Sequence, residues 1–276
     1  MLITRVLTAL VLMPLMLAAI FLLPQSLFAL AMAFMVLLGA WELANLASFD
    51  RGRWLYLLFV ALVMLLLHWL TWLILPLMAL AALWWLLAFG LIKQYPHGQA
   101  WWHARWIRAL MGLLVLVPMW QALVQLRSHE IGPWLVLLLM LFVWSADIGA
   151  YFAGRRWGKL KLAPRVSPGK TWAGVLGAMV AAFVLALLSG FLLAEQYAWG
   201  LSQWLLWALG AMLWVWVSIV GDLFESMLKR YRGIKDSSQL LPGHGGVLDR
   251  IDSLTAAAPL FLLWLVLWSG LVPNIL

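Results

Sequence analysis

The stretch from Trp172 to Ala194 reads WAGVLGAMVAAFVLALLSGFLLA and contains no charged residue. A helix needs about 20 mostly apolar residues to cross the hydrocarbon core of a bilayer. Because water is absent there, every backbone amide must find its partner within the same segment. This stretch therefore predicts a transmembrane helix.

Similar apolar runs recur along the whole chain of 276 residues, of which 66% are hydrophobic and 10% charged. That composition provides too little polar surface to cover a soluble globule. We predict an all-α, polytopic integral membrane protein, in which residues 1–276 form a single domain and residues 1–130 are mainly a helical scaffold. The predicted membrane spans lie near residues 6–23, 27–47, 54–70, 72–92, 107–126, 133–153, 172–194, 203–221 and 255–273, and the third and fourth are the least clearly separated.

The positive charges are distributed unevenly between the two predicted sides of the membrane. Of the 18 Lys and Arg residues, 17 fall on one side and only Arg127 on the other. Because positive loops stay in the cytoplasm, this predicts a cytoplasmic N-terminus and a C-terminus outside, in the periplasm. The net charge of +8 then suits anionic lipid headgroups and phosphate-bearing solutes. We expect no nucleic-acid partner, because no soluble domain is predicted to bind one.

Residues 140–260 differ in composition from the first half of the chain and are expected to carry the catalytic loops. Two predicted loops, about 154–171 and 222–254, are basic and rich in Gly and Pro. The segment from Asp222 to Asp252 alone holds 10 of the 28 charged residues. The chain has no cysteine, so any metal ion there must be held by oxygen or imidazole.

The first group of candidate residues begins at Asp147, inside the sixth predicted span. A carboxylate within a membrane segment costs a few kcal/mol on insertion scales, so it usually faces a cavity, a cation or a partner. The simpler alternative is an aspartate at a helix end that reaches the interface.

The loop after Asp147 carries six cations among glycines and prolines, which favours anion binding. The six are Arg155, Arg156, Lys159, Lys161, Arg165 and Lys170. Ser167 precedes Pro168 and predicts the start of the next helix, whose amino end would also attract phosphate. Gly169-Lys170-Thr171 does not match a nucleotide-binding P-loop, because Pro164 occupies the position of the first glycine. Positive-inside topology alone is the alternative explanation of these charges.

The second group opens at the end of the eighth predicted span. If the helix continues, Asp222, Glu225, Ser226 and Lys229 occupy positions i, i+3, i+4 and i+7 and share one face. Such a face would offer carboxylates, a hydroxyl and an ammonium group together. The alternative is an amphipathic helix end whose Glu225–Lys229 pair is a surface salt bridge of little energetic value.

Further along, His244 stands between Pro242-Gly243 and Gly245-Gly246. Glycines let backbone amides approach an anion closely. Asp249 and Asp252 follow at the head of the ninth span, on one face of a starting helix. Carboxylates beside phosphate-seeking cations suggest Mg²⁺, which one or two carboxylates hold together with substrate phosphates and water.

These motifs together resemble the signature of bacterial phosphatidate cytidylyltransferases, also called CDP-diacylglycerol synthases. The matching pattern is Ser226-x-x-Lys229-Arg230, Lys235-Asp236 and Pro242-x-His244-Gly245-Gly246-x-x-Asp249-Arg250-x-Asp252. Two upstream blocks, Asp147-x-Gly149-Ala150-Tyr151 and Ser167-Pro168-x-Lys170-Thr171-Trp172-x-Gly174, are also similar to the family. Gly169 and Ala173 depart from it, since many members carry Lys and Glu there.

The resemblance implies a transferase of phospholipid biosynthesis that converts CTP and phosphatidate to CDP-diacylglycerol and pyrophosphate. It implies a multi-pass enzyme of the bacterial inner membrane, dependent on Mg²⁺, with a homodimeric assembly and an active site facing the cytoplasm. A second, monovalent cation is compatible with it.

The resemblance also suggests roles for individual residues. The implied catalytic residues are Asp222, Lys229, Arg230, Lys235, Asp236, His244, Asp249, Arg250 and Asp252. The implied substrate-binding residues are Ser226, Arg165, Ser167, Lys170, Thr171, Gly245 and Gly246. The divalent metal is assigned to Asp222 and Asp249, with support from Asp252 or Asp147.

Two other functions remain open at this point. A CTP-dependent lipid kinase would share the nucleotide, the metal and the membrane, but would release CDP instead of pyrophosphate. A membrane transporter of anionic lipid would use the basic loops to recruit its substrate. Transporters are often built from two related halves with broken helices, whereas the charged Gly/Pro-rich segments here lie in one half only.

Overall fold

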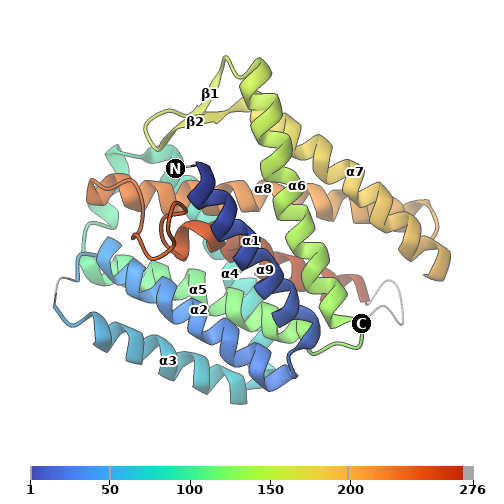
Figure 1. Cartoon of the computed structure of the whole chain (residues 1–276), viewed down its shortest axis with the longest axis horizontal. Helices are drawn as coiled ribbons and strands as arrows, with labels where there is room; N and C mark the ends of the chain where they lie inside the picture. The colour runs from blue at the N-terminus through green and yellow to red at the C-terminus, as the bar shows by residue number, and fades with distance from the viewer. Residues whose placement is uncertain (1, 50, 198, 270–276) are drawn as a thin grey trace.

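A computed structural model describes residues 2–49, 51–197 and 199–269, and within these ranges the chain forms nine α-helices (Figure 1). The helices are α1 (Leu2–Leu22), α2 (Gln25–Leu46), α3 (Arg53–Trp69), α4 (Ile74–Gln94), α5 (Arg105–Arg127), α6 (Gly132–Trp157), α7 (Trp172–Tyr197), α8 (Leu201–Arg232) and α9 (Leu248–Ser269). The short elements are the 3-10 helices η1 (Thr71–Leu73) and η2 (His97–Trp101) and the strands β1 (Lys161–Ala163) and β2 (Ser167–Thr171).

Each predicted apolar run contains a helix, which confirms an all-α, multi-pass architecture. Seven of the described helices are long and apolar enough to cross a membrane, while α3 and the part of α1 from Leu7 to Leu22 are shorter apolar segments. The third and fourth runs are separated by η1. The predicted orientation of the termini and the count of nine crossings stay predictions, and the end of the ninth run lies outside the described residues.

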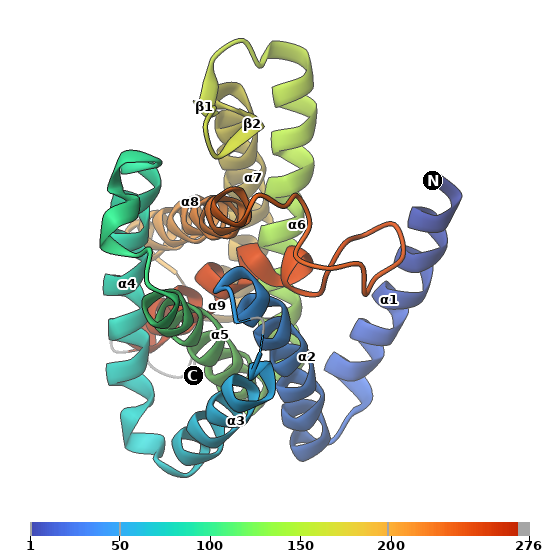
Figure 2. The same cartoon turned by 90° about the vertical axis from the view of Figure 1, so that its left-hand side faces the viewer.

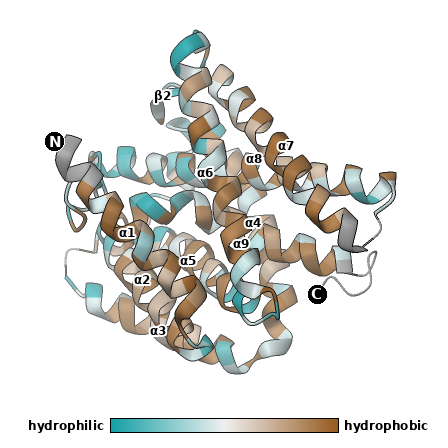
Figure 3. Cartoon of the chain, turned by 45° about the vertical axis from the view of Figure 1, so that its right-hand side comes forward, coloured by the Kyte–Doolittle hydropathy of each residue, from teal (hydrophilic) through white to brown (hydrophobic). Residues whose placement is uncertain are grey.

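The polar elements gather at the ends of the helices, while hydrophobic residues cover their middles (Figure 3). Figure 2 shows β1 and β2 beside the upper end of α6, with α8 and the segment that leads to α9 below. The two long cytoplasmic loops of the sequence prediction are therefore largely ordered secondary structure at one end of the molecule.

The predicted helix start at Ser167 is wrong. Ser167–Thr171 is the strand β2, which pairs antiparallel with β1, and α7 begins only at Trp172. Thr171 caps that helix, because its Oγ1 accepts a hydrogen bond from the backbone N–H of Gly174 at 3.1 Å. Pro168 is tolerated in this two-stranded hairpin, in which each strand has a free edge.

The second predicted loop is shorter than expected at both ends. Helix α8 continues to Arg232, and α9 already begins at Leu248, so the connecting segment spans only residues 233–247. The last turns of α8 are largely buried, and Glu225, Ser226 and Lys229 are all buried there. Because α8 continues past the predicted span, one helix face carries all four residues of the second group. These are Asp222, Glu225, Ser226 and Lys229.

Helices α6 and α7 lie against each other through small residues. A Cβ atom added to Gly149 would collide with the backbone of Gly177 and lie 2.9 Å from the Cβ of Ala181. Small residues let helix backbones approach closely inside a membrane, where packing drives helix association. This contact fixes the part of α6 that carries Asp147, two residues before Gly149, relative to α7.

Packed tryptophans hold α8 against α9. The Trp207 and Trp214 ring centroids are 5.3 Å apart, and the Trp207 and Trp268 centroids are 5.7 Å apart. All three side chains are buried. Edge-to-face aromatic pairs of this kind contribute about 0.5–1.5 kcal/mol beyond their buried area.

Candidate active site

Residues of α6, α7, α8, α9 and β2 surround a cavity of about 390 Å³. Its charged lining consists of Asp147, Arg155, Lys170 and Asp222. The Nζ of Lys170 lies 2.7 Å from Oδ2 of Asp222, and the hydroxyl of Ser226 donates to Oδ1 of Asp222 at 3.3 Å. The two groups of candidate residues, from distant parts of the sequence, therefore meet in one cavity.

Lys229 forms a second, more deeply buried cluster beside this cavity. Its Nζ lies 2.5 Å from Oδ1 of Asp249 and 3.2 Å from Oε2 of Glu225, and all three side chains are at most 11% exposed. The interpretation of Glu225–Lys229 as a surface salt bridge is therefore wrong. Removing one partner from such a buried pair is costly, because the other charge stays uncompensated.

Asp249 connects the segment before α9 to α8. Its Oδ2 accepts hydrogen bonds from the backbone N–H groups of Ser237, at 2.9 Å, and Gly246, at 2.8 Å. The hydroxyl of Ser237 lies 2.9 Å from the same oxygen. Oδ1 contacts Lys229. One carboxylate thus holds both ends of the segment that contains His244.

Glu42 of α2, which the sequence prediction did not assign to the site, contacts the segment before α9. It is 1% exposed, and each of its carboxylate oxygens lies within hydrogen-bond distance of two donors. Oε1 accepts from the Ser238 hydroxyl at 2.6 Å and from the Val247 N–H at 2.9 Å. Oε2 accepts from the Leu248 N–H at 2.6 Å, with the Ser237 hydroxyl at 3.1 Å.

Glu42 therefore caps the amino end of α9 from another helix. A carboxylate at that position satisfies N–H groups that the helix leaves unpaired, and it lies at the positive end of the helix dipole. The signal in the sequence is that Glu42 is the only acid inside the predicted spans of residues 1–130. A residue from the first half of the chain thus helps to position the start of α9.

The two glycines after His244 are required by this packing. Gly245 has φ = +82°, a left-handed conformation that favours glycine. A Cβ on Gly246 would lie about 2.5 Å from Oε1 of Glu42 and would overlap the Ser237 hydroxyl. Gly246 therefore lets its own backbone N–H reach Asp249 while the chain passes close to Glu42.

The other charged residues that the sequence assigns to the site do not line the 390 Å³ cavity. Nε of Arg230 donates to the carbonyl of Val166 at 3.1 Å and ties α8 to the turn between β1 and β2. Nη1 of Arg165 lies 3.1 Å from Nε2 of His97 in η2. Lys235, Asp236 and Arg250 are exposed.

His244 and Asp252 lie outside the 390 Å³ cavity lining. The Nδ1 of His244 is buried and has no hydrogen-bond partner among the described residues. Asp252 is half-buried, accepts from the Ser253 N–H at 2.7 Å, and lines a small separate space together with Glu225.

The carboxylates fit a divalent cation only in part. Within residues 2–49, 51–197 and 199–269, no three His, Cys, Asp or Glu side chains converge as a metal-binding group. Asp147 and Asp222 nevertheless line the same cavity, which suits the one or two carboxylates that Mg²⁺ uses beside substrate phosphates. Asp249 could add Oδ1 only if Lys229 moved away, because Oδ2 is already occupied by donors.

Comparison with known proteins shows the family to which this chain belongs. Residues 3–268 match the model of the cytidylyltransferase family, and the chain therefore belongs to that family. A phosphatidate cytidylyltransferase of Pseudomonas aeruginosa is 52% identical over 270 residues, which are 96% of this chain and 98% of the relative. The enzyme of the same name from Haemophilus influenzae is 38% identical over 93% of this chain and 96% of its own length. A Brucella suis phosphatidate cytidylyltransferase is 44% identical over 64% of this chain and 61% of its own length.

Proposed function

We propose that this protein is a phosphatidate cytidylyltransferase, which converts CTP and phosphatidate to CDP-diacylglycerol and pyrophosphate. The observation that carries the proposal is the 52% identity to a protein of that name over nearly the entire length of both chains. The meeting of Lys170 and Asp222 in one cavity supports it, because the matching motifs of both loops contribute to that cavity.

The reaction joins two anions, so neutralising their charge is the main catalytic task. An oxygen of the phosphatidate phosphate attacks the α-phosphorus of CTP, a new P–O bond forms, and the bond to pyrophosphate breaks. A phosphate monoester has a second pKa near 6, so the nucleophile is mostly dianionic at neutral pH and needs no strong general base. Positioning and electrostatic stabilisation then carry most of the rate enhancement.

Lys170 and Arg155 line the cavity and are the cations best placed to hold phosphate oxygens. Lys170 is paired with Asp222 at 2.7 Å, so an arriving phosphate would exchange one anionic partner of Lys170 for another. Asp222 would at the same time become free to bind a cation.

We assign Mg²⁺ to Asp222 and Asp147, which line the same cavity. A bound Mg²⁺ ion would shield the attacking and leaving oxygens from each other's charge. The buried Lys229 cluster holds Asp249 and Gly246 in place, so its role in this proposal is to position the segment from Ser237 to Leu248. A monovalent cation could occupy the remaining carboxylate oxygens.

The lipid would reach the cavity from the bilayer. Tyr151 lines the cavity and is exposed, and Ile148 on α6 and Leu176 on α7 are also exposed apolar side chains. The acyl chains can therefore stay in the membrane while the headgroup enters among the cations. In this proposal the enzyme lies in the bacterial inner membrane as a homodimer, and its active site faces the cytoplasm, where CTP is present.

The test is to reconstitute the purified protein with phosphatidate, CTP and Mg²⁺ and to measure both products. Equimolar CDP-diacylglycerol and pyrophosphate are expected, and Asp222→Asn should abolish both. Glu130→Gln is the matched control, because Glu130 is an exposed carboxylate outside the cavity. CDP with a newly phosphorylated lipid would instead identify a kinase, and absence of CTP turnover would favour a transporter.

A further inference from the structure

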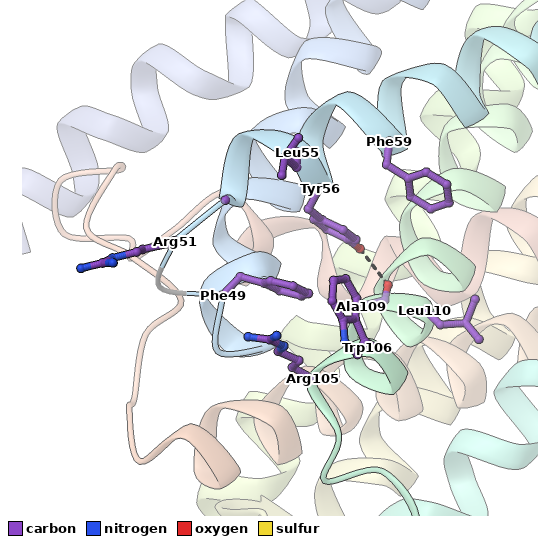
Figure 4. A pocket seen from close by; sticks show the side chains of 10 residues that line it. Phe49, Arg51, Leu55, Tyr56, Phe59, Arg105, Trp106, Ala109 and Leu110 are labelled. Carbon is purple, nitrogen blue, oxygen red and sulfur yellow. Dashed lines mark hydrogen bonds between the residues drawn. The ribbon is translucent and has the colours of Figure 1, made fainter.

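A second cavity, of about 420 Å³, lies between α3, α5 and the end of the segment that follows α2 (Figure 4). It shares no lining residue with the candidate active site. We call it the α3–α5 groove. Neither the proposed reaction nor the family motifs assign it a role.

The body of the groove is apolar and open to the surroundings of the protein. Leu55 and Phe59 on α3 are each 53% exposed, and Trp106 and Leu110 on α5 are 65% and 55% exposed. Tyr56 is buried between the two helices, where its hydroxyl donates to the carbonyl of Ala109 at 2.9 Å. The floor is therefore fixed, while the walls offer hydrocarbon contact.

Arg105 lies beside Phe49 and Trp106, Arg51 extends outward from the loop on the same side of the groove, and Phe59 and Leu110 lie at the other end (Figure 4). Both arginines are exposed. The guanidinium of Arg105 lies 5.2 Å from the Trp106 ring centroid and 5.7 Å from that of Phe49, so aromatic faces hold it near the groove. Within the described ranges neither arginine is recorded in an ion pair.

The charged end of the groove belongs to the same end of the molecule as the last turn of α8. Nε of Arg232 donates to the carbonyl of Asn45 at 3.2 Å, and Nη2 of Arg108 donates to that of Ala47 at 3.0 Å. The Arg108 guanidinium also lies over the ring of Tyr231 on α8. Arg51 and Arg105 therefore lie at the end of the molecule where α8 ends, which the sequence predicts to be the cytoplasmic side.

We propose that the α3–α5 groove binds an anionic glycerophospholipid of the surrounding bilayer, at a site distinct from the catalytic one. The lipid phosphate would contact Arg51 and Arg105, and one acyl chain would run along Leu55, Phe59 and Leu110. Arginine suits this role because its fork of N–H donors matches phosphate oxygens. An apolar trough closed by cations at one end complements a molecule with one anionic end and one hydrocarbon end.

The proposal is tested with the full-length protein in phosphatidylcholine nanodiscs that contain phosphatidylglycerol with a photoreactive group in its acyl chain. After illumination, mass spectrometry of the peptides should place the label on α3 and α5, within the groove. Because a basic side chain near an anionic surface contributes roughly 1 kcal/mol, each of Arg51→Gln and Arg105→Gln should lower labelling about fivefold.

Two matched controls separate the groove from its surroundings. Lys93→Gln removes an exposed cation of α4 outside the groove and should leave labelling unchanged. Leu55→Trp should fill the groove and block labelling, whereas Leu58→Trp should not, because Leu58 is similarly exposed on α3 but does not line it. Size-exclusion chromatography of each variant shows that a loss of labelling is not a loss of folding.

Competition distinguishes the possible occupants. Unlabelled phosphatidylglycerol should displace the probe, while phosphatidylcholine and inorganic phosphate should not. Equal displacement by phosphatidylcholine would show that the groove contacts acyl chains without selecting an anionic headgroup. Displacement by inorganic phosphate would indicate a site for free anions. Displacement by phosphatidate alone would make it a substrate site, and cross-links between two protein copies through α3 and α5 would make it an interface. Each of these four results would overturn the proposal.

Discussion

Glu42 and Leu248 are joined by a hydrogen bond of 2.6 Å between the buried carboxylate of α2 and the first backbone N–H of α9. The N–H of the preceding residue, Val247, donates to the other carboxylate oxygen at 2.9 Å. A helix in the first half of the chain therefore sets the position of the helix that carries Asp249. The arrangement of the candidate site depends on this contact as much as on the signature residues themselves.

Replacing Glu42 by glutamine should destabilise the protein and reduce turnover. The glutamine amide has a single acceptor oxygen, so at least one buried N–H of Val247 or Leu248 would lose its partner. A buried unsatisfied polar group costs about 1–3 kcal/mol. Thermal unfolding in detergent should show a lower midpoint, and the CTP turnover rate should fall.

Glu42→Asp is the informative companion variant, because it keeps both acceptor oxygens on a shorter side chain. It should recover part of the lost turnover. Glu130→Gln, which removes an exposed carboxylate, should leave both measurements unchanged. Wild-type stability and turnover in Glu42→Gln would show that the α9 cap does not support the site.

Asp222 and Asp249 should respond differently to the same change to asparagine. Asp222→Asn should abolish turnover with little loss of stability, because the Asp222 side chain is 31% exposed and its partner Lys170 is 23% exposed. Asp249→Asn should also remove turnover, but it should lower the unfolding midpoint as well, because Asp249 shares a buried pair with Lys229.

Measuring Mg²⁺-dependent turnover and unfolding on the same preparations separates the two roles. A rise in the Mg²⁺ concentration needed by Asp222→Asn, if any turnover is left, would support its role in metal binding. Full stability in Asp249→Asn would mean that the cluster around Lys229 does not hold the segment before α9.

The helices and the general position of the site could be predicted from the sequence, because both depend on local patterns. Apolar runs of sufficient length set the helices, and residues from the charged segments at the ends of α6 and α8 line one cavity, as the motifs suggested. The strand at Ser167–Thr171 was missed because Ser167-Pro168 is also typical of a helix start, and the pairing with Lys161–Ala163 is a tertiary contact. The role of Glu42 was missed for the same reason, since its partners lie 195 to 206 residues away.

Gly246→Ala should be one of the most damaging small substitutions in the chain. The added Cβ would overlap the Ser237 hydroxyl and lie about 2.5 Å from a Glu42 carboxylate oxygen, and both neighbours are buried and hydrogen-bonded. Overpacking of this kind typically costs about 1–3 kcal/mol. We expect a lower unfolding midpoint and loss of turnover.

Gly90→Ala on α4 is the control, because nothing lies within 4 Å of its added Cβ, and it should be neutral or slightly stabilising. Equal behaviour of the two variants would rule out the close approach at Gly246.

The predicted orientation in the membrane can be tested directly, because the chain contains no cysteine. Arg127 donates to the carbonyls of Ile20 and Leu23, which brings the α1–α2 and α5–α6 connections to the same end of the molecule. Arg232 and Asn45 join the ends of α8 and α2, as expected if successive connections alternate between the two sides.

A cysteine at the exposed Glu130 should therefore react with a membrane-impermeant maleimide in intact cells, and a cysteine at the exposed Lys235 only after lysis. The opposite pattern would place the candidate site on the periplasmic side, away from CTP, and would contradict the proposed function together with the topology.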